Sequence, residues 1–584
     1  MKKIYFQSVA YSFFLLLFLL ASCKKDSFLG QTTTSNLTEE TVFKDSANTV
    51  SFLAGIYTGV GFSAAANRFT YGPSAFNQTP NGGLDASSDE AEVFNSGGST
   101  ALAWETGTIN AAVVTDDAYK KTYVNIRAVN QLLKNLPKSP INAFSKTQMK
   151  AEARFLRAWY YAILLKHYGG IHLVGDSIYN YTDKIPAARN TYEECVNYII
   201  AECDAAALDL PTTQSGVNYG RASKGACLTL KARVLLYAAS PLFNGEALSG
   251  TKNDAVLGYT SFSRERWKLA EDAAAAVIGL SAYNLYVDNG TSPGFGFQYL
   301  FTQRFNSEYI FQYMSPAGNY DLEALFQPPS RTGQNGAFPL QGLVDAFPMS
   351  NGKAITDPTS GYDPQKPYTN RDPRLNYTVI RDQTPIQNRL SAGLSPVNIY
   401  QGTFNGVSTG PDAVHIGTST GYYTNKMLAP NAVANDFTHR TDRVLPLMRY
   451  AEILLNYAEA ANEYDGPTSQ VYAALQAIRQ RAGLNPYQLP VGLSQAAMRE
   501  VIRNERRIEL AFEEHRFWDV RRWKIAETTD NIQTMGMEVN RNGTAVTYTP
   551  FPVRKRNFRT AMYLWPLPQT EVAKSAELIQ NPGY

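Results

Sequence analysis

One stretch of the sequence matches a catalytic motif in residue type and spacing. Residues 290–294, Gly-Thr-Ser-Pro-Gly, fit the G-x-S-x-G pattern, in which a serine nucleophile is held in a strained turn between a strand and a helix. Pro293 and the sequence GFGFQY after it are not expected to open a helix. The surroundings of Ser292 therefore argue against a serine hydrolase.

Residues that could bind metal ions or phosphate form no recognisable motif. The five histidines fall in no HExxH motif or tight Cys/His cluster, and no glycine-rich loop is followed by Lys-Ser or Lys-Thr. We therefore predict no metal ion and no cofactor. Calcium binding stays open, because carboxylates are plentiful but no EF-hand-like loop marks a site. A glycosidase carboxylate pair also stays open, since it needs a separation of roughly 5 to 9.5 Å in space and no fixed spacing in sequence.

A lone cysteine behind an apolar run is a third candidate for chemistry. Lys2 and Lys3 precede an apolar run at residues 9–20, which would span roughly 18 Å as a helix and is too short for the roughly 30 Å hydrocarbon core of a membrane. This pattern is typical of an export signal. The sequence Leu-Ala-Ser-Cys that ends at Cys23 resembles the lipobox of bacterial lipoproteins, in which the cysteine sulfur receives a diacylglycerol and becomes the first residue of the mature chain.

The lipobox predicts that residues 1–22 are a signal peptide and that Cys23 is the lipidation site. The alternative is an ordinary signal peptide in which the cysteine occurs by chance. A diacylglycerol makes an effectively stable anchor, because each buried methylene contributes about 0.8 kcal/mol. The polar, threonine-rich residues 23–41 would then form a lipidated flexible tether, and globular patterning starts near Val42.

The other three cysteines, Cys195, Cys203 and Cys227, are expected to be buried, small apolar side chains. A disulfide of Cys195 or Cys203 with Cys227 stays open for an oxidising compartment. Their eight-residue spacing points Cys195 and Cys203 in different directions on a helix.

Composition and charge exclude some classes of protein. The 584 residues are 44% hydrophobic and 18% charged, which are globular values rather than those of a disordered chain. The formal charge is only +3, so no nucleic-acid partner is predicted. The length allows one large domain with insertions, or two to three domains.

Amphipathic or buried helical patterns are frequent along the chain. Ser145 and Gln148 have the spacing of a capping box ahead of one such pattern, which Gly169 and Gly170 end. Helices are predicted over residues 145–168, 222–239, 264–280, 449–464, 468–482 and 494–514. Helix pairs with alanine at contact positions are typical of tetratricopeptide-like stacking. We predict a mainly all-α fold, a tetratricopeptide-like superhelix of helix pairs with large irregular, loop-rich insertions.

Residues 281–441 are dense in Gly, Pro, Asn and Tyr and interrupt the helical patterns. A segment of this length with little regular structure is usually a functional insertion, so we expect it to contribute ligand surface. The two ends of this insertion predict an N-terminal helical region at residues 42–280 and a C-terminal helical region at residues 442–584.

The charge-rich residues 499–523 are predicted to be structural. Opposite charges recur at i,i+3 in Glu500/Arg503, Arg506/Glu509 and Glu513/Arg516. Such pairs stabilise a helix from within, so this run is better explained by its own fold than by ligand binding.

Seven segments of the chain, together with the FLG after Cys23, closely resemble the SusD/RagB family of nutrient-binding lipoproteins, and they occur in the family's order. The segments are EARFLRAWYYAILLKHYGG, GRASKGACLTLKARVLLYAASP, RDPRL, RYAEILLNYAEAANE, AIRQRAGL, RNERRIELAFEEHRFWDVRRW and the ending YLWPLPQTEVAKSAELIQNPGY. The resemblance implies a non-enzymatic protein, lipid-anchored at the outer face of a Gram-negative outer membrane. It also implies capture of oligosaccharide or polysaccharide, with delivery to a SusC-type TonB-dependent transporter.

The matched motifs are scaffold motifs, so ligand-binding residues have to be sought in the irregular regions. Sugar recognition needs a flat aromatic face and amide, carboxylate or guanidinium groups. Trp104 is the one tryptophan in a sequence that reads as a loop, whereas Trp159, Trp267, Trp518, Trp523 and Trp565 read as core. The candidates are Trp104, Arg68, Tyr71, Asn77 and Asp85 in the first irregular region, residues 61–110, and Tyr299, Tyr313 and Tyr320 in the insertion at residues 281–441.

Three other functions stay open. A peptide-capturing RagB-like lipoprotein is the nearest alternative, because aromatic loops suit either ligand. A glycoside hydrolase would need a carboxylate pair lining an aromatic cleft. A purely structural helical scaffold would show no stabilisation by any oligosaccharide.

Overall fold

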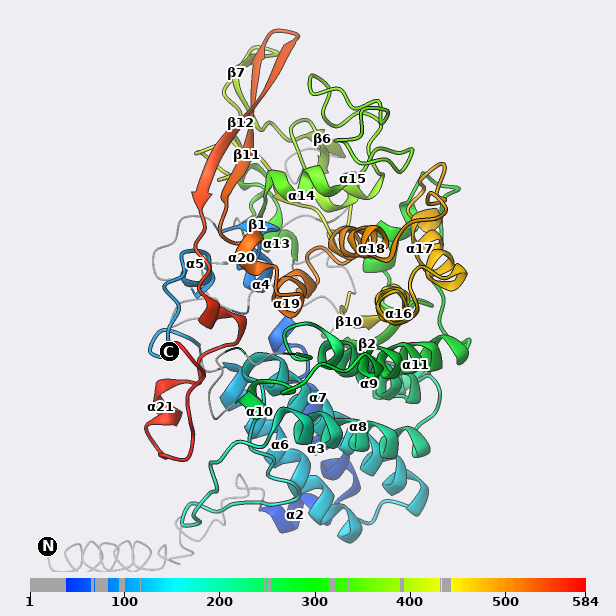
Figure 1. The fold of residues 1–584 in the computed structure, drawn as a ribbon, viewed down its shortest axis with the longest axis vertical. Coiled ribbons are helices and arrows are strands. Elements are labelled where there is room, and N and C mark those ends of the chain that lie inside the picture. The colour runs from blue at the N-terminus through cyan, green and yellow to red at the C-terminus, as the bar shows by residue number, and fades with distance from the viewer. Residues whose placement is uncertain are drawn as a thin grey trace, which may run out of the picture.

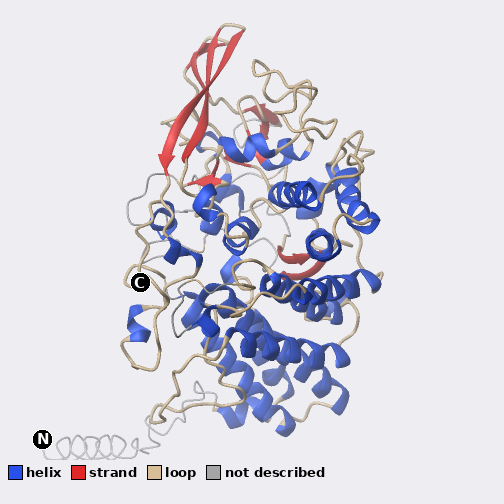
Figure 2. Cartoon of the chain, viewed as in Figure 1, coloured by secondary structure: helices blue, strands red, loops and turns tan. Residues whose placement is uncertain are grey.

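The structure is a computed structural model and is mainly α-helical (Figure 2). It describes residues 38–64, 68, 82–93, 100–115, 117–245, 248, 254–314, 322–333, 336–388, 393–430, 432 and 443–584. Cys23 and the signal and tether segments upstream of residue 38 therefore lie outside the described residues. None of the helices in these ranges combines the length and the apolarity needed to cross a membrane. The predicted fold class is confirmed.

The first half of the chain forms a stack of antiparallel helices in which each packs against the next along the sequence (Figure 1). The helices are α3 (Ser46–Tyr57), α6 (Asp117–Asn135), α7 (Ala143–Tyr168), α8 (Tyr192–Asp209), α9 (Lys224–Ala239) and α11 (Glu265–Gly279). Small residues such as Ala270 and Ala274 of α11 are buried at these contacts. This serial packing is the tetratricopeptide-like arrangement that the sequence predicts.

Local signals set most helix ends, with one correction. The α7 helix begins at Ala143 and not at Ser145, because the side chain of Asn142 accepts a hydrogen bond from the backbone N–H of Ser145. It ends as predicted at Gly169, whose φ of 78° suits glycine.

A second group of helices continues the stack from α11 and carries it into the C-terminal region. These helices are α16 (Tyr450–Asp465), α17 (Ser469–Arg481), α18 (Gln495–Glu509) and α19 (His515–Arg522). The expected end of α18 at Glu514 is wrong, since the helix stops at Glu509. Phe512 and Glu514 both have positive φ, at 57° and 62°, and turn the chain into α19.

The charge-rich segment 499–523 is structural, but mostly through other partners than predicted. Glu500 and Arg503 do pair at 3.1 Å within α18. Arg506 instead bonds Asp519, and Arg516 bonds Asp89. Glu509 accepts hydrogen bonds from the guanidinium groups of Arg374, Arg449 and Arg481, which come from three other elements. These buried pairs therefore join elements together instead of lining one helix.

Strands are short except in one hairpin, which the sequence analysis did not anticipate. Strands β11 (Gln533–Asn542) and β12 (Ala545–Lys555) pair antiparallel, and β7 (Tyr400–Phe404) adds to β11 in parallel. The hairpin projects from the end of the molecule opposite to α2 (Glu39–Phe43) (Figure 1). It links the insertion to the C-terminal region.

The insertion contains the short helices α12 (Phe295–Tyr299), α13 (Leu322–Phe326), α14 (Gln341–Ala346) and α15 (Arg374–Thr378) between turns and small two-stranded sheets. Two of these sheets tie it to other parts of the chain. Strand β3 (Phe338–Pro339) pairs with β1 (Ala91–Glu92), and β2 (Tyr309–Tyr313) pairs with β10 (Leu445–Arg449). The first irregular region and the insertion therefore lie side by side.

The C-terminal segment packs against the N-terminal helices. The backbone N–H of Trp565 donates to the carbonyl of His167 at 2.7 Å. The side-chain amide of Asn581 donates to the carbonyl of Tyr168 at 3.1 Å. The last residues of the chain thus complete the surface of α7.

Candidate ligand-binding site

Trp104 does not lie in an exposed loop, so this expectation is wrong. It belongs to α5 (Thr100–Glu105) and is 2% exposed. Its ring packs against Phe517 and Trp565, with centroids 5.3 and 5.2 Å away. Helix-favouring alanines precede it in α5, and the indole enters the core instead of facing a ligand.

Arg68 and Asp85 are also placed inside the protein and not on a binding surface. The guanidinium of Arg68 donates to Asp117 at 2.9 Å, and its side chain has no exposed surface. Asp85 accepts a hydrogen bond from the backbone N–H of Glu514 at 3.0 Å, and burial raises its pKa well above the ordinary value. Both side chains serve internal contacts, because a buried polar group has to be hydrogen-bonded within the protein.

The described candidate tyrosines of the insertion are more exposed to solvent than Trp104 and Asp85. Tyr313 is half-buried over Gly61, where an added Cβ would come within 2.6 Å of its ring. Tyr299 is exposed and stacks on Phe295 at 5.5 Å. The remaining candidates, Tyr71, Asn77 and Tyr320, lie outside the described residues.

Ser292 has no hydrolase setting, although one detail of the prediction was wrong. A short helix, α12, does begin at Phe295 after the motif, with Gly294 as its N-cap in the left-handed region. The hydroxyl of Ser292 lies 2.9 Å from the hydroxyl of Tyr377 and not beside a histidine. The three thiols of Cys195, Cys203 and Cys227 are buried, as predicted, and the disulfide that the sequence left open is not formed among them.

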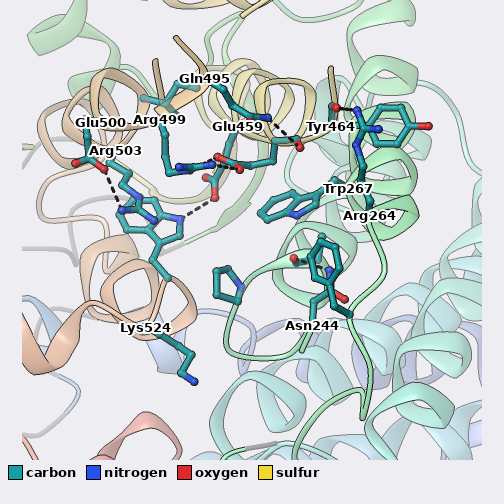
Figure 3. A pocket seen from close by; sticks show the side chains of 16 residues that line it. Asn244, Arg264, Trp267, Glu459, Tyr464, Gln495, Arg499, Glu500, Arg503 and Lys524 are labelled. Carbon is teal, nitrogen blue, oxygen red and sulfur yellow. Dashed lines mark hydrogen bonds and ion pairs between the residues drawn. The ribbon is translucent and has the colours of Figure 1, made fainter. Parts of the chain in front are cut away.

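A cavity of about 860 Å³ lies between α11, α16 and α18 (Figure 3). The turn after α9 and the end of α19 complete its wall. This volume is within the range of small-molecule sites, roughly 300 to 1,000 Å³. Aromatic rings and polar groups both line it, as they do in a sugar-binding site.

Aromatic side chains reach the cavity from several elements. Phe262, just before α11, is 66% exposed. Trp267 lies on α11 with its indole at the cavity (Figure 3). Trp523 follows α19, and its N–H donates to Glu459 at 2.7 Å, which fixes the ring in place.

Polar groups are held in place on the opposite side by α16 and α18. Arg499 bonds both carboxylate oxygens of Glu463, at 2.5 and 2.6 Å. The side-chain amide of Gln495 donates to the carbonyl of Asn462 at 2.6 Å. Arg503 pairs with Glu500, and its guanidinium lies 5.0 Å from the ring centre of Trp523. These contacts set the directions of the groups before any ligand arrives.

The charges around the cavity nearly balance. Four cationic side chains and three carboxylates line it. Burial would raise the pKa of Glu459, but Arg522 and Arg506 more than offset this and hold the pKa below its ordinary value. A neutral, polar ligand fits such a site better than a highly charged one.

This cavity is not predicted from the sequence, because Trp267 lies on an alanine-rich helix face and Trp523 in a scaffold motif, and both patterns indicate core. They are indeed 6% and 4% exposed, yet each borders open space. The available signal was Phe262, an aromatic residue in the polar sequence TSFSRER just before the helix. No sequence pattern indicates that α11 and α18 line the same cavity.

Two family profiles and a sequenced relative match parts of this chain. A profile described as the SusD family matches residues 288–584. A second profile, described as starch-binding associating with outer membrane, matches residues 27–236. The SusD-like protein P2 of Formosa agariphila is 35% identical over 143 residues, which is 24% of this chain and 25% of that protein. The alignment therefore spans about a quarter of the relative's length.

Solved structures align over nearly the whole chain. A SusD-like protein from Bacteroides fragilis is 26% identical, with a TM-score of 0.73 and coverage of 94% of this chain and 99% of its own. A SusD-like carbohydrate-binding protein from the same organism is 24% identical, with a TM-score of 0.69 and coverage of 92% and 100%. A laminarin-binding SusD-like protein is 21% identical, with a TM-score of 0.63 and coverage of 93% and 100%. The last two show a shared fold.

Proposed function

The chain belongs to the SusD family, and on this premise we propose that it captures oligosaccharides at the cell surface. The observation that carries the proposal is the cavity between α11, α16 and α18, where aromatic rings face polar groups already held in place. Relatives of the same fold are described as carbohydrate-binding and laminarin-binding. The association of the family with the outer membrane agrees with this role.

Each wall of the cavity suits a different part of a sugar. The exposed ring of Phe262 offers a flat face for the C–H side of a pyranose. The carboxylate of Glu500 is 70% exposed and has an oxygen free to accept from a hydroxyl, because Arg503 occupies the other. Arg503 keeps N–H groups that are not used in this ion pair and that can donate to a ring or hydroxyl oxygen.

The cavity favours binding over glycoside hydrolysis. Glu459, Glu463 and Glu500 each pair with a guanidinium. A glycosidase needs one carboxyl that keeps its proton near neutral pH as the general acid. The pKa of Glu459 is held below its ordinary value by Arg522 and Arg506, which does not suit a general acid. Glu463 and Glu500 are each bonded to an arginine, so all three side chains are better suited to hold hydroxyl groups than to transfer protons.

Anchoring and delivery complete the proposal. Acylation of Cys23 would hold the protein on the outer membrane, and the segment after it would act as the tether. A SusC-type TonB-dependent transporter would receive the captured oligosaccharide. Both steps rest on the sequence resemblance and on the family match.

Titration calorimetry with oligosaccharides prepared from laminarin and from starch tests the proposal. We expect Phe262→Ala to weaken binding roughly tenfold through loss of ring contact, with unchanged stability because the side chain is largely exposed. Phe305→Ala is the matched control, since Phe305 is 62% exposed and lies outside the cavity. Tyr299→Ala tests the surface of the insertion in the same way.

The possible results separate the alternatives. Loss of affinity in Tyr299→Ala but not in Phe262→Ala would move the site to the insertion. Binding of peptides without binding of any oligosaccharide would replace glycan capture with peptide capture. Release of shorter sugars from a bound oligosaccharide would show hydrolysis and contradict a capture role.

A further inference from the structure

A second cavity lies in the N-terminal helices, far along the stack from the first. It has a volume of about 760 Å³ and is formed by α6, α7, α8 and the loop after α7. Its basic lining residues are Lys134, Lys150, Arg154 and Arg157, and its acidic ones are Asp176 and Glu202. Nothing in the proposed capture of oligosaccharides uses this site.

The basic groups are gathered by helix geometry. Lys150, Arg154 and Arg157 follow one another at intervals of four and three residues, so they lie on the same face of α7. Lys134 adds a fourth positive charge from the last turn of α6. The side of α7 that faces the cavity is therefore a basic strip.

Glu202 and Asp176 together balance the charges of the two arginines, so no carboxylate of the lining is left for the lysines. Arg154 and Arg157 both donate to Glu202, at 2.8 and 3.0 Å, and Arg157 also bonds Asp176. Arg157 and Glu202 are buried, so their ion pair forms a fixed base for the site. With four cations against two carboxylates, the lining carries a net charge of +2.

The two lysines are available to a ligand. The ammonium of Lys150 is exposed and makes no ion pair with the described residues. Lys134 lies 3.8 Å from Glu39, but both side chains are about half exposed, at 58% and 47%. Such a pair is weak and yields easily to a stronger anion.

The uncharged part of the lining is mostly apolar, and its one amide, Asn130, is already bonded to Arg157 and to the carbonyl of Gly175. Leu133, Ile178 and Tyr198 contribute carbon surface, and the hydroxyl of Tyr198 is buried without a hydrogen-bond partner among the described residues. An anion attached to an uncharged or apolar body would fill this cavity better than a free, fully hydrated ion.

The site lies beside the start of the described chain. The α2 helix packs at the end of α6, where the amide of Asn135 donates to Glu39 at 2.6 Å. Cys23 precedes Glu39 by sixteen positions in the sequence, a length that reaches at most about 55 Å. If Cys23 is acylated as proposed above, the membrane lies within this reach of α2, which is at the same end of the helical stack as the start of α7 (Figure 1).

We propose that the cavity between α6, α7 and α8 binds the phosphate headgroup of an anionic lipid in the membrane that carries the protein. Lys134 and Lys150 would contact the phosphate, and the apolar lining would contact the glycerol or sugar next to it. This contact would fix how the tethered protein is oriented on the membrane. The inference is independent of the oligosaccharide site.

Vesicle binding tests this inference with the full-length chain carrying Cys23→Ala, which removes the acylated sulfur. Binding is measured to phosphatidylcholine vesicles with and without phosphatidylglycerol. The difference between the two compositions cancels the contribution of the apolar N-terminal run. We expect Lys134→Gln/Lys150→Gln to reduce the preference for phosphatidylglycerol roughly tenfold or more, at about 1 kcal/mol for each lysine.

The matched control is Lys120→Gln/Lys366→Gln, which makes the same charge change at two exposed lysines. Lys120 is on α6 itself, about 21 Å from Lys134 along the helix. Equal losses in both double variants would show a general charge effect and overturn the site. Strong competition by inorganic phosphate would show a free-anion site, and binding of an acidic peptide with no lipid preference would indicate a protein partner; either result contradicts the lipid proposal.

Discussion

The two ends of α18 use the same residue types for opposite purposes. Near its C-terminus, Glu509 has no exposed side-chain surface and binds three arginines from distant segments. Near its N-terminus, Arg499, Glu500 and Arg503 form pairs at the edge of an open cavity. The difference lies in solvent access: buried charges have to be compensated completely, whereas exposed pairs keep unused hydrogen-bonding groups for a ligand.

The largest loss of stability is expected when the buried ion pairs of Glu509, at the C-terminal end of α18, are removed. Glu509→Ala would remove the carboxylate that Arg374, Arg449 and Arg481 share and leave N–H groups of all three without their acceptor. Each arginine keeps another carboxylate partner, drawn from Asp372, Glu505, Glu308 and Glu513. We expect the free energy of unfolding to fall by about 3 to 5 kcal/mol, as for other buried ion pairs that lose one partner. Urea denaturation measures it. A loss below about 1 kcal/mol would show that water replaces the carboxylate at this junction.

A smaller effect on stability is expected at Glu514. Its carboxyl group is buried like that of Glu509, but no arginine among the described residues is bonded to it in the way that three are bonded to Glu509. Burial raises its pKa to about 8, although Arg68 and Lys166 oppose the shift. The folded state therefore holds a proton that the unfolded state releases above its ordinary pKa near 4.5, and stability falls as the pH rises from about 5 to 8. Between pH 5 and 7, we expect Glu514→Gln to remove a decline on the order of 2 kcal/mol.

This pH window is chosen because Lys166 acts in the opposite direction. Burial lowers the pKa of Lys166 to about 7, so its contribution to stability rises with pH mainly above 7. Urea denaturation at pH 5, 6 and 7 compares the variant with the unchanged chain. Parallel pH profiles for the two proteins would show that Glu514 is ionised throughout.

The next prediction concerns the part of α18 that borders the cavity and is tested by oligosaccharide affinity. Arg503→Met keeps the length of the side chain but removes its N–H donors. We expect oligosaccharide binding to weaken roughly fivefold, which corresponds to one net hydrogen bond. Calorimetry with the oligosaccharide found to bind measures the change, and Arg127→Met, an exposed arginine on α6, is the control. Unchanged affinity would remove Arg503 from the proposed site.

The smallest effect on stability is expected when the solvent-exposed pair of Glu500 and Arg503, at the edge of the cavity, is broken. Glu500→Gln breaks an ion pair whose carboxylate is 70% exposed. We expect the free energy of unfolding to change by less than about 0.5 kcal/mol, because solvent screens such pairs. A loss comparable to that of Glu509→Ala would show that the two ends of α18 do not differ in the way described.

The helices could be predicted from sequence because their signals are local. Periodicity, capping residues and glycines placed α7, α9, α11, α16 and α17 to within a few residues. The β11–β12 hairpin was not predicted, because neither its length nor its parallel partner β7, more than 130 residues earlier, is marked by a local pattern. The end of α18 was misplaced because the chain turns at two non-glycine residues with positive φ.

Site residues were harder to predict than helices. Trp104 and Arg68 have the side chains that a sugar site needs, but their partners Trp565 and Asp117 are distant in sequence and draw them into the interior. The reverse holds for Trp267, whose alanine-rich surroundings indicate core although a cavity opens beside it. Exposure is decided by long-range packing, which residue type and spacing do not encode.

The closure of α7 by the C-terminal segment affects the order of events in biosynthesis. Trp565 and Asn581 contact His167 and Tyr168 across roughly 400 residues of sequence, so these contacts cannot form until the ribosome has released almost the entire chain. Until then the nascent protein has an unfinished N-terminal layer. The end of α7 is therefore covered later in synthesis than the contacts between neighbouring helices of the stack, which join segments close in sequence.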